Sequence, residues 1–182
     1  MIVLKSQLVT SAVHEAGGVI AMQILHTGRY GYHFSSVSAS AIKAPISFTT
    51  PTALSSADVE ATIEDFVRCA VLAKEGGYDG VEIMGSEGYL INQFIARKTN
   101  KRSDDWGGSY ANRCRFPIEI VRRIRQAVGK DFVIIYRLSM LDLIDEGSSW
   151  QEVVELAQKI EVAGASIINT GISLCTVVES NR

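Results

Sequence analysis

Three polar side chains stand in apolar or glycine-rich surroundings, and together they could bind a small organic molecule and give it a proton. Gln23 lies inside the apolar run 19–25, where a buried amide needs a specific partner for its donor and acceptor groups. Arg137 stands inside the otherwise apolar run 132–138, so its guanidinium requires an anion or an electron-rich oxygen. Tyr89 follows the segment 85–88, and a phenol stays neutral at pH 7 while it can still donate a proton.

Each of these residues also has a structural interpretation. Gln23 could bond to the backbone or to water at the end of a strand, and Arg137 could form an internal salt bridge with Glu82. Tyr89 could be an ordinary amphipathic packing residue. Glu87, two residues earlier, could tune that tyrosine, polarise a bound water or cap the short helix that follows.

The composition excludes several function classes. Lys and Arg number 18 against 20 Asp and Glu, and the resulting net charge of −2 argues against a nucleic-acid-binding protein. Cys69, Cys114 and Cys175 are far apart and form no CxxC or Cys/His cluster, which predicts neither a disulfide framework nor a zinc or iron–sulfur site. No apolar run approaches the roughly 20 residues of a membrane span. We therefore expect a soluble domain in the reducing cytoplasm.

The elements that must position these residues follow an α/β pattern. Apolar runs at 19–25, 80–84, 132–138 and 166–170 predict strands that are covered on both faces. Capping boxes at Ser55 and Ser149 predict two of the intervening helices, and further helices are expected at 6–16 and 116–128. Pro117 predicts that the last of these begins or bends there. Repeated βα units of this kind build parallel sheets.

Two long connections carry most of the polar residues. They span 27–54 and 85–109, and the second contains a short helical stretch at 89–96. Loops at the carboxyl ends of parallel strands hold the functional sites of doubly wound sheets and of (β/α)₈ barrels. A barrel usually needs about 250 residues, so the length alone favours an open sheet.

Four segments resemble the old yellow enzyme family of FMN-dependent barrels. They are 22–29 (MQILHTGR), 77–116, 134–139 and 164–171, and they resemble strands three to six of that barrel with their loops. The strings QILHTGRY, MGSEGYLIN and YRLSMLD are most similar to the bacterial-type 2,4-dienoyl-CoA reductase branch. The resemblance covers about 6–172 and outweighs the length argument. It implies one partial TIM-barrel domain over 1–182, with a divergent tail at 173–182.

The resemblance also implies roles for particular residues. Gln23 would bind the pyrimidine edge of FMN, and Arg137 would stabilise the reduced flavin. Tyr89 would protonate the substrate while NAD(P)H supplies the reducing equivalents through the flavin. Arg97 and Lys98 would meet the phosphates or pantetheine of an acyl-CoA thioester, although a solvated basic pair is the simpler interpretation. His26 could lie near the flavin, but a structural histidine is favoured over this.

The sequence departs from the family pattern at several positions. Many members carry His-x-x-His or His-x-x-Asn before the tyrosine, whereas Met84 and Glu87 stand here. An acidic residue at the second position fits the dienoyl-CoA reductase branch. The histidine that this branch places after strand six corresponds to Cys175. A generic ene-reductase or NADH oxidase therefore remains an alternative.

The missing strands have physical consequences. Four strands of a closed barrel leave two unpaired edges and an uncovered face, which predicts weak or absent FMN binding and allows self-association. A non-catalytic truncated product is the third alternative. In each enzymatic alternative, the resemblance implies that the substrate is a small molecule.

Overall fold

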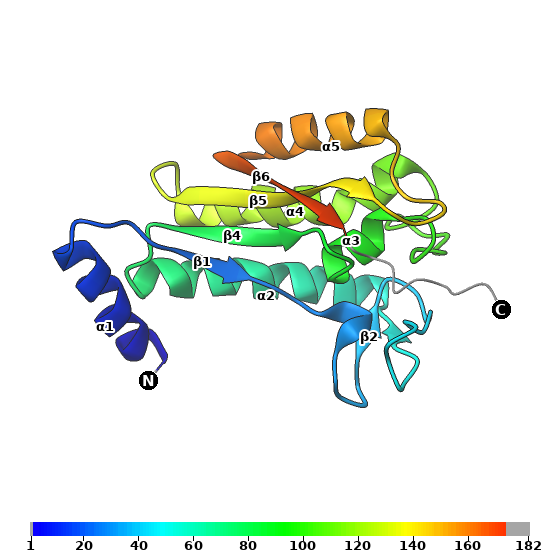
Figure 1. The fold of residues 1–182 in the computed structure, drawn as a ribbon, viewed down its shortest axis with the longest axis horizontal. Coiled ribbons are helices and arrows are strands. Elements are labelled where there is room, and N and C mark those ends of the chain that lie inside the picture. Colours follow the sequence, from blue (N-terminus) through cyan, green and yellow to red (C-terminus); the bar gives the residue numbers. More distant parts are fainter. Residues whose placement is uncertain (1, 174–182) are drawn as a thin grey trace.

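The computed structural model describes residues 2–173 and contains a four-stranded parallel sheet (Figure 1). The strand order is β1 (Ala21–Ile24), β4 (Gly80–Gly85), β5 (Val133–Asp142) and β6 (Ile167–Ser173), which is also their order along the chain. All neighbouring pairs are parallel. A two-stranded parallel sheet, β2 (Val37–Ser38) with β3 (Thr52–Ala53), lies in the first long connection. The four strands expected from the apolar runs are confirmed.

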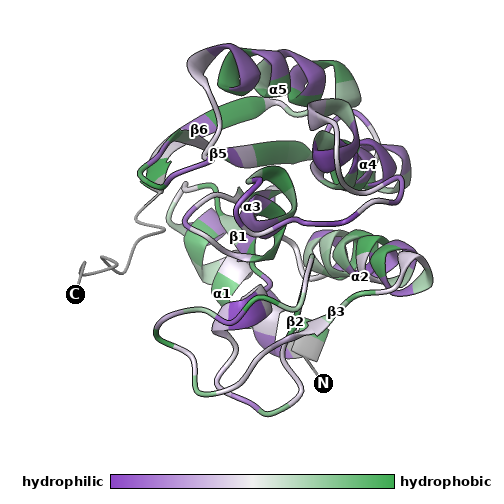
Figure 2. Cartoon of the chain, turned by 90° about the vertical axis from the view of Figure 1, so that its right-hand side faces the viewer, coloured by the Kyte–Doolittle hydropathy of each residue, from purple (hydrophilic) through white to green (hydrophobic). Residues whose placement is uncertain are grey.

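The helices of the described chain lie before and between these strands. They are α1 (Ile2–Glu15), α2 (Ser56–Glu75), α3 (Leu90–Ile95), α4 (Tyr110–Val128) and α5 (Trp150–Ala163), with a 3₁₀ turn η1 at Gly28–Tyr30. Viewed towards the ends of the strands, α2, α4 and α5 lie along the outer side of a curved sheet (Figure 2). A doubly wound sheet carries helices on both faces. Helices on one face, with sequential strand order, therefore agree with the expected portion of a (β/α)₈ barrel.

The hydrophobic core lies between the sheet and these helices. Alternate strand residues face it, and Val81, Ile83, Ile134 and Tyr136 are completely buried. From the helices, the core receives apolar side chains at helical spacing, among them Ile63, Phe66, Phe116, Ile120, Ile124 and Ile160. The other face of the sheet is uncovered by helices in the described chain, and its side chains from Gln23, Glu82, Ile135, Arg137, Ile167 and Asn169 are half-buried or exposed. This face presents the polar strand residues described below.

The local signals at the helix ends act as expected, with one exception. Ser55 and Ser149 both form capping boxes, with Asp58 and Glu152 respectively. The helix expected at 116–128 instead begins at Tyr110, where Ser109 accepts a hydrogen bond from the backbone of Asn112. Pro117 therefore lies inside α4 and does not begin it. No helix within residues 2–173 is both long and apolar enough to span a bilayer.

The loop after α3 is a closed structural unit. Asn100 donates from Nδ2 to the carbonyls of Phe94 (2.7 Å) and Trp106 (2.8 Å), and Trp106 is buried against Phe116. Arg102 bonds to Asp104 and to the backbone carbonyls of Ala39 and Leu54, and so ties the two long connections together.

Candidate functional site

The uncovered face of the sheet carries a row of hydrogen-bonded polar side chains. Glu82 on β4 accepts from Gln23 Nε2 of β1 at 2.6 Å and from Asn169 Nδ2 of β6 at 2.5 Å. The register pairs Gln23 with Glu82, and the sheet alternation then places Arg137 of β5 on the same face. A carboxylate only accepts hydrogen bonds, so the Gln23 amide nitrogen faces Glu82 and its oxygen is directed elsewhere. The nitrogen of Gln23 therefore bonds to a side chain on the neighbouring strand, whereas bonding to backbone or water stays a prediction for its oxygen.

Arg137 is held by an ion pair at the carboxyl end of β5. Its Nε and Nη2 atoms lie 2.9 Å and 2.7 Å from Oε1 of Glu87. The alternative of a salt bridge to Glu82 is therefore wrong, because the carboxylate that pairs with Arg137 lies in the loop after β4. One carboxylate oxygen engages two adjacent nitrogens of the guanidinium. This contact fixes the plane of the guanidinium group.

The turn before Tyr89 has a special backbone conformation. Glu87 has φ +61° and Gly88 has φ +75°, so two consecutive residues occupy the left-handed region, which is uncommon for a glutamate. The side chain of Asn92 accepts from the Gly88 backbone N–H at 2.9 Å. Tyr89 is the N-cap of α3, and no side-chain hydrogen bond caps that helix. The expectation that Glu87 caps the helix is wrong, since its carboxylate is turned towards Arg137.

Tyr89 lies at the carboxyl end of β4, next to the first long connection. Its ring meets the Tyr30 ring edge-on, with 6.1 Å between the ring centroids and 89° between the ring planes. The side chain is half-buried, which leaves part of it accessible to a ligand. Glu87 of the same turn holds Arg137. The structure thus brings Tyr89 and Arg137 to one end of the sheet, with Gln23 on the adjoining face, while their roles stay predictions.

A buried glutamine, which the sequence reasoning missed, holds this end of the molecule together. Gln93 Oε1 accepts from the Arg29 backbone N–H at 3.1 Å and from the Ser38 hydroxyl at 2.9 Å. Its Nε2 donates to the carbonyls of Gly88 (2.7 Å) and Thr27 (3.3 Å). The available signal was a polar residue among the apolar residues of the short helix, since a buried amide must be satisfied. Gln93 therefore fixes both long connections against α3.

His26 is structural, as the sequence favoured. Its Nδ1 accepts from the backbone N–H of Gly28 at 3.0 Å, and its backbone carbonyl accepts from Leu90. Burial lowers the pKa of the imidazole, so the ring is neutral at pH 7 and can act as this acceptor.

Arg97 and Lys98 lie next to a polar groove at the same end of the sheet. Arg97 is exposed and lines the groove together with residues 100–102 and part of the segment 146–152, around a volume of ≈ 860 Å³. Lys101 forms an ion pair across it with Glu146 at 2.5 Å. The hydrogen bond and charge of Lys101, followed by the charges of Arg97 and Lys98, lower the pKa of Glu146. Lys101 was not among the predicted residues.

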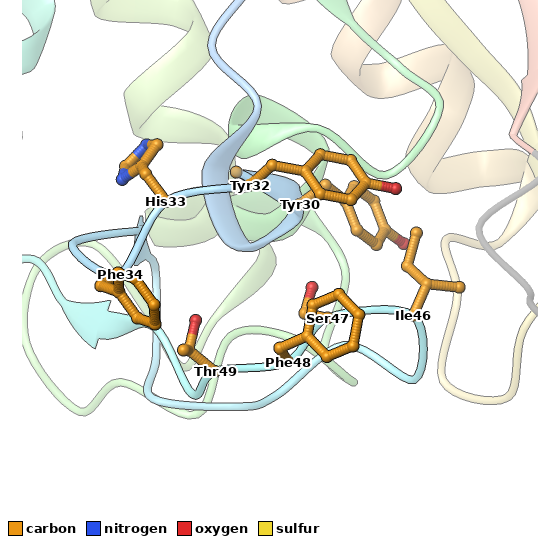
Figure 3. Close-up of a pocket in the computed structure, with 9 residues that line it drawn as sticks. Tyr30, Tyr32, His33, Phe34, Ile46, Ser47, Phe48 and Thr49 are labelled. Atoms are coloured by element: carbon orange, nitrogen blue, oxygen red, sulfur yellow. The ribbon is translucent and has the colours of Figure 1, made fainter.

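A small aromatic pocket lies in the first long connection (Figure 3). Residues 30–34 and 46–49 line a volume of ≈ 240 Å³, and Figure 3 shows the Phe48 ring below those of Tyr30 and Tyr32. Tyr30 belongs both to this pocket and to the contact with Tyr89. Sequence reasoning treated this connection only as a long loop, although its density of aromatic residues was a signal for a binding surface.

The polar groups of the uncovered face fit the edge of a flavin ring. Gln23 binds Glu82 through its nitrogen, so its amide oxygen can accept from a ring N–H. Arg137 binds Glu87 through Nε and Nη2, so its Nη1 edge can face a ring oxygen or a negative charge. Within residues 2–173, no group of three or more His, Cys, Asp or Glu could hold a metal ion. Cys175 lies outside the described residues.

Comparison with known proteins gives consistent matches. The model of the NADH:flavin oxidoreductase / NADH oxidase family matches residues 3–181. An NADH oxidase of Thermoanaerobacter brockii is 39% identical over 180 residues, which are 94% of this chain and 28% of that protein. A 2-naphthoyl-CoA reductase in complex with 2-naphthoyl-CoA is 34% identical with a TM-score of 0.84, over 93% of this chain and 29% of that chain. The old yellow enzyme homologue of Zymomonas mobilis is 29% identical with a TM-score of 0.85, over 92% of this chain and 52% of that chain.

These matches confirm the partial-barrel interpretation of the fold. The solved relatives are old yellow enzyme barrels, and the chain aligns with only part of each of them. The chain spans about half or less of the length of the proteins named above.

Proposed function

The chain belongs to the NADH:flavin oxidoreductase / NADH oxidase family, and from this we propose that it carries the substrate-reducing side of an FMN-dependent enzyme. The proposed reaction is the NAD(P)H-driven reduction of a conjugated C=C bond in an acyl thioester of the 2,4-dienoyl-CoA type. The observation that carries this proposal is the arrangement of Arg137, Glu87 and Tyr89. A guanidinium and a phenol stand at one end of the sheet, joined through a single turn of the chain.

Each of four residues of this chain would have a separate role in the reaction. FMN supplies hydride transfer from NAD(P)H to one carbon of the conjugated bond. Gln23 would hold the ring edge through its amide oxygen, and Arg137 would place positive charge beside the reduced ring. Tyr89 would donate its phenolic proton to the other carbon of the bond, where negative charge develops. Glu87 would keep the Arg137 guanidinium in one orientation.

A thioester substrate agrees with two further features. Met84 and Glu87 replace the residues with which many family members hold a simple enone carbonyl, so a small enone lacks its usual hydrogen-bond donors here. Arg97 and Lys101 line the polar groove, the charge of Lys98 acts on Glu146 of the same groove, and these cations could meet the phosphates of CoA. The solved relative with a bound acyl-CoA, 2-naphthoyl-CoA, supports this substrate class for the family.

A generic ene-reductase acting on enones or quinones is the second candidate. The fold match to the old yellow enzyme homologue of Zymomonas mobilis supports it, with a TM-score of 0.85. The two candidate functions differ in whether the substrate binds in the polar groove. An acyl-CoA has phosphates that could bind there, whereas a small enone has none.

A chimeric barrel tests the proposal, because the chain spans only part of the relatives. Residues 6–172 would replace the aligned segment of the T. brockii NADH oxidase, and NAD(P)H oxidation would be followed with a 2,4-hexadienoyl thioester and with cyclohexenone. We expect turnover of the thioester, reduced by roughly 10²-fold or more in Tyr89→Phe, since general acids contribute about that much. Flavin reduction by NAD(P)H should stay unchanged in that variant.

The Tyr78→Phe chimera is the matched control and should retain full turnover, because Tyr78 lies just before the amino end of β4, at the opposite end of the strand from Tyr89. Turnover of cyclohexenone alone would favour the generic ene-reductase. A flavin-loaded chimera that reduces the thioester equally well with Tyr89→Phe would contradict the role assigned to Tyr89.

A further inference from the structure

The lining of the aromatic pocket of residues 30–34 and 46–49 contains no Asp, Glu, Lys or Arg. Tyr32, Phe34 and Phe48 are 89%, 94% and 88% exposed, an unusual degree for three aromatic side chains in one loop pair. Two polar groups of the lining are engaged within the chain, since Ser47 donates to the Arg29 carbonyl at 2.8 Å and His33 bonds to Ser35 at 3.1 Å. The pocket therefore suits a neutral, apolar ligand.

The pocket and Tyr89 are connected through Tyr30 and Gln93. Tyr30 lines the pocket and meets the ring of Tyr89 edge-on. Gln93 accepts from the Arg29 backbone beside the pocket, and it donates to the carbonyl of Gly88 beside Tyr89. A ligand that contacts Tyr30 therefore lies next to Tyr89, which is the proton donor in the proposed function.

The volume of the pocket limits what it can hold. At ≈ 240 Å³ it is smaller than the roughly 300–1,000 Å³ of pockets that enclose drug-sized ligands, so it accommodates one apolar end of a larger molecule. Aromatic side chains gain most from a flat partner, against which rings stack or meet edge-on.

We propose that this pocket is a substrate subsite that takes the flat acyl end of the substrate, an aromatic or polyunsaturated acyl group, and presents it to Tyr89. The inference rests on the proposed function, and it assigns specificity to residues of the first long connection. Saturated acyl groups, which are not flat, bind there more weakly. A protein surface or a second copy of the chain is the competing occupant.

A titration of the 182-residue chain tests the subsite without flavin. The probe is methyl 2-naphthoate, compared with its saturated analogue methyl decahydro-2-naphthoate, and binding is followed by NMR shifts of the backbone amides. We expect saturable shifts in residues 30–34 and 46–49 and at Tyr89, with the flat ester bound at least fivefold more tightly. The double variant Phe34→Ala/Phe48→Ala should weaken its binding about tenfold. Both side chains are exposed, so the fold should be retained, as circular dichroism would show.

Val162→Ala is the matched control, because Val162 is an equally exposed apolar residue on α5. Its binding constant should equal that of the unaltered chain. Absence of saturable shifts, or equal binding by the Phe34/Phe48 variant, overturns the subsite. A dimer that dissociates in that variant overturns it as well, because a second copy is then the occupant. The flavin-dependent chimera described above fails or succeeds independently of this titration, so the two proposals are separable.

Discussion

At Arg137, geometry matters more than ion-pair energy. The guanidinium and the Glu87 carboxylate are 28% and 32% exposed, so solvent screens much of their attraction. The pair nevertheless engages two adjacent nitrogens of Arg137, which fixes the plane of the guanidinium group. Glu87 therefore acts mainly by orienting the positive guanidinium of Arg137. Its carboxylate reaches Arg137 from a residue with an unfavourable positive φ.

Tyr136 and Tyr110 give a matched pair of stability predictions. The Tyr136 hydroxyl is completely buried without a hydrogen-bond partner, whereas that of Tyr110 donates to the carbonyl of Glu152. Burial raises the pKa of both phenols far above its ordinary value, so both remain protonated at neutral pH. We expect Tyr136→Phe to increase the free energy of unfolding by about 1 kcal/mol and Tyr110→Phe to decrease it by about 1 kcal/mol.

Urea denaturation at pH 7 measures both changes. Each variant keeps the ring, so the difference isolates the hydroxyl group. A loss of stability in Tyr136→Phe would mean that its hydroxyl has a partner, such as a buried water.

Sequence reasoning identified single residues better than it identified their partners. Gln23, Arg137 and Tyr89 stood out because each is polar in an apolar or glycine-rich setting. The partners of Gln23 and Arg137 depend on the strand register and on the path of a loop, neither of which is local in sequence. Glu82 was considered for Arg137 and instead binds Gln23 and Asn169, while Glu87 reaches Arg137 through a left-handed turn.

At the scale of elements, α3 depends on Gln93. This helix has six residues and no side-chain cap, too few for a helix to be stable by itself. Gln93→Leu would leave the Ser38 hydroxyl and the backbone groups of Arg29, Gly88 and Thr27 without this partner. We expect a loss of about 3 kcal/mol in the free energy of unfolding, measured by urea denaturation.

Gln151→Leu on the exposed surface of α5 is the control for this substitution. It should change the stability by less than about 0.5 kcal/mol. Equal effects of the two substitutions would show that the hydrogen bonds of Gln93 do not hold α3 in place.

The loop after α3 has a defined pH dependence. Hydrogen bonds from Arg102 lower the pKa of Asp104 from 3.8 to about 2. The stabilisation is therefore present above pH 3.8 and disappears as the pH falls through about 2. Allowing for solvent screening, we expect Asp104→Asn to cost about 1 kcal/mol at pH 6, and this cost should vanish near pH 2. Denaturation of both chains across this pH range measures the difference.

Asp105→Asn is the control for this pH dependence. Asp105 is 81% exposed and lies 3.9 Å from Arg115, so its replacement should leave the stability curve unchanged. A cost for Asp104→Asn that is independent of pH would contradict the charge-based explanation.

The elements themselves were largely predictable, because their signals are local. Both capping boxes and all four strands of the main sheet formed where the sequence indicated them. The start of α4 was misjudged because Pro117 is normally a strong signal for a first turn. The N-cap is Ser109, and the polar residues after it are typical of a loop in the sequence. In the structure, Arg113 is buried and donates hydrogen bonds to the carbonyls of Ile95 and Gly108.

For the whole molecule, the main consequence of the fold is an uncovered sheet face between two edge strands. Parallel sheets are normally covered on both faces, and a closed barrel has no edges. In the described chain, β1 and β6 are edge strands, and Ile167 of β6 is 51% exposed on the uncovered face. The sequence resemblance predicted this situation, since it matched only strands three to six.

We therefore expect the 182-residue chain by itself to associate as its concentration rises, through pairing of these edges. A lysine at an edge opposes such pairing because its charge would have to be buried. Ile167→Lys should weaken association at least tenfold in sedimentation velocity, whereas Val162→Lys, at an exposed position on α5, should leave it unchanged. A chain that stays monomeric at every concentration, or equal effects of both substitutions, would show that the edges are protected by other means.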